Sequence, residues 1–110
     1  MNVNFNGYGE NVATFMADSK VQAGSPVKMS ADGTVTASSA TEPFCGVCIA
    51  VRDGYASVQL AGYVTMPTKS KIAVGYQKLT ASVDNTVAVN TSGREFLVLN
   101  STETEVGFIL

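Results

Sequence analysis

The sequence predicts an all-β protein, a small β-barrel or alternatively a β-sandwich, built from eight or nine short strands. Three observations favour this fold class. The chain contains 15 Val and 11 Thr but only 5 Leu, and branching at Cβ suits a pleated strand better than a helix. Apolar residues recur with a period of two, and Asp-Gly or similar turn signals separate the runs.

The clearest predicted strand covers residues 55–66. Its even positions are mostly apolar, whereas its odd positions carry a mixture of aromatic, polar and small side chains. That alternation places one apolar face on the strand. Pro67 follows and has no N–H to donate, so we expect the strand to end there.

The remaining strands are shorter and are bounded by turns. Asp32-Gly33 and Asp53-Gly54 predict hairpins, whose central residues both need positive φ. Residues 10–20 also show helical spacing, but their β-branched residues and missing capping box favour a strand. The other expected strands cover residues 27–29, 34–36, 44–52, 78–83, 86–90, 95–99 and 106–110.

Similar segments in the two halves of the sequence indicate that the chain arose from a duplicated half. Residues 23–29 resemble 74–79, residues 32–35 resemble 85–87, and residues 45–49 resemble 106–110. A repeat of this kind predicts a duplicated three-strand unit that closes into one barrel. It is too short for a solenoid, which needs at least three repeats.

The length of 110 residues predicts a single domain over residues 11–110, preceded by an N-terminal arm over residues 1–10. The arm carries Val3, Phe5 and Tyr8 among asparagines and glycines. These three side chains are our candidate partner contacts. The alternative interpretation of the segment is an edge strand or a frayed terminus.

The charge pattern excludes several classes of partner. The net charge is −2, and the 7 basic residues form no cluster that could neutralise phosphates, so we expect no nucleic-acid binding. We expect no membrane segment, because no apolar run approaches the length of a span. The first residues lack a basic and apolar signal pattern, so we expect a protein that is not secreted.

The sequence contains few residues that could support catalysis or bind a metal ion. The chain has no His, which removes Ser-His-Asp catalysis. Cys45-Gly46-Val47-Cys48 resembles a redox or zinc half-site, but it lies in an apolar run with no further Cys or His. Two small apolar residues of the core or of a strand explain it better. Glu103 and Glu105 favour a solvated turn, so we predict no enzyme, cofactor or metal.

Several segments together resemble the capsid cement proteins, or head decoration proteins, of tailed phages. The opening resembles theirs over residues 11–17, 21–27 and 33–35. Two further strands of that family resemble residues 45–51 and 58–64, and its second half resembles residues 72–75 and 106–110.

This resemblance implies a phage or prophage structural protein, made in the bacterial cytoplasm and located in the virion. It would bind the major capsid protein on the outer surface of the assembled shell and stabilise the shell. It also implies a homo-oligomer, with a trimer favoured. The alternatives are another particle component, such as a head fibre, a spike or a tail-tube domain, and a generic ligand-binding barrel.

Overall fold

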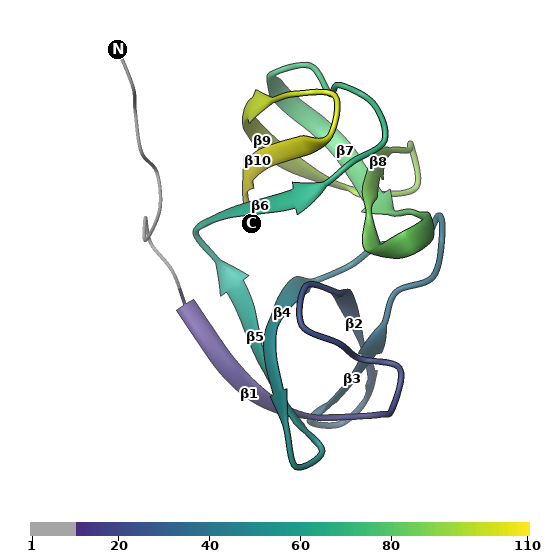
Figure 1. Ribbon diagram of the computed structural model, residues 1–110, viewed down its shortest axis with the longest axis vertical. Helices are drawn as coiled ribbons and strands as arrows, with labels where there is room; N and C mark the ends of the chain where they lie inside the picture. The colour runs from purple at the N-terminus through teal and green to yellow at the C-terminus, as the bar shows by residue number, and fades with distance from the viewer. Residues whose placement is uncertain (1–10) are drawn as a thin grey trace.

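The computed structural model describes residues 11–110 and confirms the all-β class (Figure 1). Within these described residues, every regular element is a strand apart from one 3-10 turn, η1 (Val83–Asn85). The ten strands are β1 (Asn11–Ala17), β2 (Pro26–Ala31), β3 (Thr34–Ala37), β4 (Gly46–Arg52), β5 (Tyr55–Ala61), β6 (Tyr63–Pro67), β7 (Gly75–Ala81), β8 (Val87–Val89), β9 (Arg94–Ser101) and β10 (Glu105–Ile109). Residues 10–20 therefore contribute a strand, as expected.

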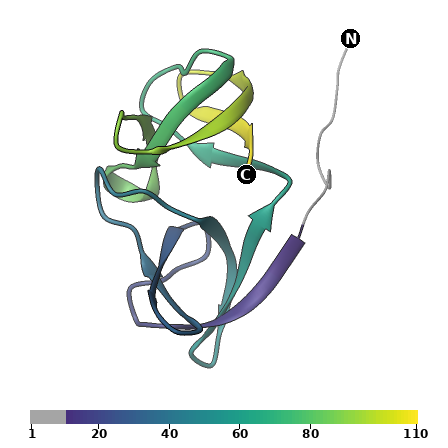
Figure 2. The same ribbon diagram turned by 180° about the vertical axis from the view of Figure 1, so that it is seen from behind.

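The strands form two five-stranded units that lie one beyond the other along the long axis of the molecule (Figure 2). The first unit is a closed barrel with the strand order β1-β3-β2-β4-β5. The second is a sheet with the order β6-β10-β9-β7-β8. The predicted barrel over residues 11–110 is thus a closed barrel from the first five strands, with a second sheet beside it.

The two units share one topology. In the barrel, β1 runs parallel to β3, and every other neighbouring pair is antiparallel. In the second unit, a parallel bridge between Thr68 and Val87 brings the end of β6 to β8, and all named pairs are antiparallel. Strands β1 to β5 therefore correspond one by one to β6 to β10.

The predicted repeat is correct for its first two segments and wrong for the third. Residues 23–29 and 74–79 lead into or through β2 and β7, and residues 32–35 and 85–87 lead into β3 and β8. Residues 45–49 belong to β4, whose counterpart is β9 rather than β10. The repeated unit has five strands instead of three, because each unit adds one strand before the shared hairpin and two strands after it.

A sharp corner at Gly62 splits the predicted strand over residues 55–66 into β5 and β6, which raises the expected eight or nine strands to ten (Figure 1). Gly62 has φ of 91°, a conformation that residues with a Cβ rarely adopt. The buried Gln59 side chain secures the corner by donating to the carbonyls of Ala61 at 3.1 Å and Tyr63 at 2.9 Å. The strand then ends at Pro67, as predicted.

The hairpin turns follow their sequence signals with one correction. Asp53 and Gly54 both have positive φ, 53° and 80°, as the prediction requires. At the other predicted hairpin only Gly33 does, with φ of 67°. The pairing of β2 with β3 has a register shift between Met29 and Ala31, close to this turn. A bulge of this kind goes together with a turn in which only one residue has positive φ.

Each unit has its own apolar core. The barrel encloses a cluster of small side chains: Val21, Val27, Val35, Cys48, Ala56 and Val58. The second core is larger and centres on three phenylalanines. Phe96 stacks on Phe44 with ring centroids 5.1 Å apart and contacts Phe108 at 5.2 Å. Because Phe44 precedes β4, the segment that connects β3 to β4 packs into the second unit.

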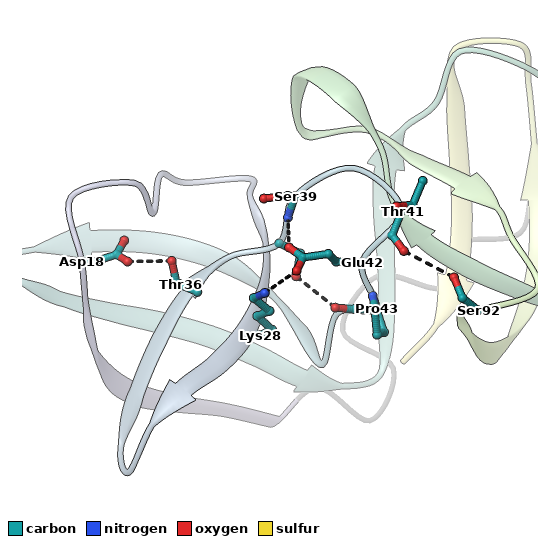
Figure 3. Close-up of polar contacts among 9 residues, drawn as sticks. Asp18, Lys28, Thr36, Ser39, Thr41, Glu42, Pro43 and Ser92 are labelled. Atoms are coloured by element: carbon teal, nitrogen blue, oxygen red, sulfur yellow. Dashed lines mark hydrogen bonds and ion pairs between the residues drawn. The ribbon is translucent and has the colours of Figure 1, made fainter.

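This connecting segment also links the units through polar contacts (Figure 3). The main chain of Thr41 donates to the Ala81 carbonyl, and Ala81 donates back to Glu42, at 2.8 and 2.9 Å. The Glu42 carboxylate accepts from Lys28 Nζ at 2.5 Å and from the Ser39 N–H at 2.6 Å. One residue thus contacts the second unit with its main chain and the first unit with its side chain.

These contacts predict that part of the stability is lost in acid. The hydrogen bonds from Lys28 and Ser39 lower the pKa of Glu42 below its ordinary value. A carboxyl group with a lowered pKa stabilises the fold above its unfolded pKa and loses this contribution as the pH falls through the folded value. We expect urea unfolding to show a decline in stability below about pH 4.5 that is smaller in Glu42→Gln.

The control for this experiment is Glu103→Gln, because the Glu103 side chain is exposed and has no hydrogen bond or ion pair with residues 11–110. Its unfolding should follow the wild-type dependence on pH. Parallel pH profiles for Glu42→Gln and the wild type would show that the Glu42 contacts contribute nothing.

Candidate interaction surface

The two cysteines are packing residues in the structure. Cys48 is buried in the barrel core and points its thiol at the Ala50 carbonyl, 3.5 Å away, and Cys45 is half-buried. Burial raises the pKa of both thiols, which disfavours the reactive thiolate. The two cysteines form no disulfide. Within residues 11–110 no three His, Cys, Asp or Glu side chains gather to hold a metal ion.

The most distinctive surface is a row of apolar and aromatic side chains across the second unit. Ile109 of β10 pairs with Tyr63 of β6 on one side and with Leu97 of β9 on the other, and Leu97 pairs with Tyr76 of β7. The four residues share one register line. We call Tyr63, Ile109, Leu97 and Tyr76 the outer stripe.

Strand alternation places the stripe on the face away from the core. Phe96 and Phe108, which are next to Leu97 and Ile109 in their strands, are buried in the phenylalanine cluster, and Val64, next to Tyr63, packs against that cluster. Because successive side chains point to opposite faces, Leu97 and Ile109 face outward. This unit is therefore apolar on both faces along one line, which is unusual for an antiparallel sheet with one solvated side.

The exposed fraction of the stripe rises from one end to the other. Tyr63 is 8% exposed, Leu97 and Ile109 are half-buried, and Tyr76 is 68% exposed. Val74, which precedes β7, is 66% exposed. The buried Tyr63 fixes the position of one end of the outer stripe. At the other end, Tyr76 presents an exposed aromatic ring with a polar hydroxyl, a side-chain type that is enriched in protein interfaces.

The Tyr63 side chain packs directly over a glycine, Gly107, on the neighbouring strand. A Cβ on Gly107 would lie 2.2 Å from the Tyr63 hydroxyl and 2.5 Å from the Asn100 side-chain oxygen. The missing side chain therefore lets Tyr63 cross β10, and its hydroxyl lies 3.4 Å from Asn100 Oδ1. This contact explains why position 107 is occupied by glycine.

The stripe is bordered by a pair of opposite charges. Lys78 of β7 lies opposite Glu95 of β9, one outward position along from Tyr76 and Leu97. An apolar line with a polar margin resembles the core and rim of a protein–protein interface.

The barrel has a second group of exposed apolar side chains. Met16 of β1 pairs with Tyr55 of β5, and they are 55% and 53% exposed. Val12 lies on the same face of β1 and is 52% exposed. The charged Arg52 pairs with Tyr55 from the other side, so this surface is more mixed than the outer stripe.

The sequence prediction did not find these surfaces. Its candidate contacts Val3, Phe5 and Tyr8 lie outside the described residues, so their role stays a prediction. The sequence signal that could have indicated the outer stripe is an unbroken apolar run in β9, Phe96-Leu97-Val98-Leu99, which makes both faces of that strand apolar. Pairing between distant strands was needed to align them with Tyr63 and Tyr76.

The comparisons with known proteins do not identify a family. The chain matches no protein-family model and has no significant match among curated proteins. Among residues 11–110 there is no helix with the length and apolar character needed to cross a membrane.

Proposed function

We propose that this protein is a virion structural protein that binds the outer surface of an assembled tailed-phage capsid and stabilises it. The observation that carries the proposal is the resemblance to capsid cement proteins. Its segments fall on β1, the approach to β2, β4, β5 and β10, so they are framework strands of both units. The partner is the major capsid protein, and the protein has no catalytic role.

The outer stripe supports this role physically. It presents Tyr76 and Leu97 on a rigid sheet, so binding orders few side chains and costs little conformational entropy. A shell repeats the same surface many times, and linked weak contacts on a repeated lattice gain strength through effective concentration. An uncharged apolar line suits a contact that must persist over a range of salt concentrations.

The elongated shape favours one alternative, another component of the particle. The molecule measures 41 × 27 × 19 Å, with two β units in sequence along the chain. Such a form also suits a head fibre, a spike or a tail-tube domain. These components differ from a cement protein in copy number and in the surface that they bind.

The outer stripe can be tested with purified protein and shells that lack it. We expect Tyr76→Asp and Leu97→Asp to weaken binding to the shells by tenfold or more in co-sedimentation, at about 1.4 kcal/mol per factor of ten. The control Val89→Asp changes an equally apolar and 55% exposed residue outside the stripe. Equal binding by all three variants would exclude the stripe as the contact.

A further inference from the structure

Strand β1 has an open edge along most of its length. The Met16 N–H donates to the Gly33 carbonyl on the β3 side, at 2.9 Å, and the Ala17 N–H donates to Gly54 on the β5 side, also at 2.9 Å. Main-chain groups of successive strand residues point to alternate sides, so Val12 and Thr14 point the same way as Met16. The register of β3 reaches only Met16 and Ala17, so these groups have no strand partner among residues 11–110.

The corresponding strand of the second unit, β6, has an edge that is protected at both of its ends. The Leu110 N–H donates to the Gly62 carbonyl at 3.0 Å, so the groups of Tyr63 and Pro67 point away from β10. On that side the Gln59 side-chain amide already donates a hydrogen bond to the Tyr63 carbonyl, at 2.9 Å. Pro67 has no N–H to offer. The two units thus contain equivalent strands, one with protected ends and one with an open edge.

The open edge carries none of the features that prevent strand pairing. Residues Asn11–Ala17 include no Lys, no Pro and no charged residue of any kind. Val12 and Thr14 are β-branched and exposed. We propose that this edge pairs antiparallel with β1 of a second copy of the chain, which joins two barrels into one continuous sheet.

The register of this pairing follows from which groups are open. Centring the pair on Ala13 places Val12 opposite Thr14 of the second copy, and Thr14 opposite its Val12. Both residues point their main-chain groups at the partner, so each facing pair exchanges both N–H···O=C bonds. The same patch serves both copies, as a two-fold contact requires, and the lack of charge in β1 avoids like-charge repulsion.

The inference does not depend on the proposed function, because it needs no shell, and it predicts a two-fold dimer where the family resemblance implies a trimer. We would measure the mass of the free full-length protein by sedimentation equilibrium, and the hydrogen exchange of the Val12 and Thr14 amides by NMR. We expect a dimer with both amides protected. Thr14→Pro removes an N–H that points away from β5, so the barrel should remain intact while the dimer dissociation constant rises at least about tenfold.

A second variant and a control guard against simple misfolding. Val12→Lys should weaken the dimer by placing two positive charges in the shared sheet. Val89→Lys changes a similarly exposed valine outside the edge and should leave the dimer intact. A free protein that is monomeric throughout, or a trimer unaffected by Thr14→Pro, would overturn the proposal. So would a monomer with a protected Thr14 amide, because another segment would then cover the edge.

Discussion

Replacing Phe96 with alanine is expected to destabilise the protein by about 3–5 kcal/mol, a large share of the stability of a chain of this size. Phe96 is 2% exposed and lies between the rings of Phe44 and Phe108. Removing its ring leaves a cavity that β strands on several sides cannot close. It also removes one of the contacts through which the segment before β4 joins the second unit.

The adjacent residue provides the control for this measurement. Leu97 lies on the same strand but faces outward and is half-buried, so we expect Leu97→Ala to cost only about 1 kcal/mol in urea unfolding. A similar loss of stability in the two variants would contradict the assignment of the two faces of β9. It would also remove the basis for the outer stripe.

Gly93→Ala is expected to have the second large effect, roughly 2–4 kcal/mol. The turn between β8 and β9 passes so close to β7 that a Cβ on Gly93 would lie 2.2 Å from the Leu79 carbonyl oxygen. That neighbour is main chain in the middle of a paired strand, so it cannot rotate away. The whole turn would have to move and would strain the Gly93 N–H bond to the Asn90 carbonyl.

Gly33→Ala separates this steric effect from the general cost of losing a glycine. Gly33 has nothing within 4 Å of the added Cβ, and its φ of 67° is strained for alanine, so we expect a cost of about 1 kcal/mol. Thermal and urea unfolding of both variants provide the comparison. If Gly93→Ala proved no more harmful than Gly33→Ala, the close approach of the turn to β7 would be wrong.

Local signals predicted the fold class and most of the strands, because they depend on neighbouring residues. Asp53-Gly54 and Asp84-Asn85 have positive φ at both positions, and both lie at reversals between strands. The corner at Gly62 was missed because the apolar alternation continues through it from β5 into β6. A change of sheet leaves the period of two intact, so only the φ of one glycine marks it.

Long-range pairing explains the other differences. The segments at residues 45–49 and 106–110 look alike because both place a run of apolar residues around a glycine, yet β4 and β10 occupy different places in their units. The outer stripe likewise joins β6, β10, β9 and β7, whose order in the sheet differs from their order in the chain. Sequence patterns define the faces of a strand but leave its neighbours open.

The proposal of a capsid-binding protein is tested most directly by counting the protein in particles. Phage particles would be purified from a host that carries the gene, and the protein would be quantified against the major shell protein by mass spectrometry. We predict nearly as many copies as of the shell protein, and their removal by gentle dissociation while shells stay intact. A few copies per particle would indicate a spike, fibre or tail component, and absence from the particles would contradict the account.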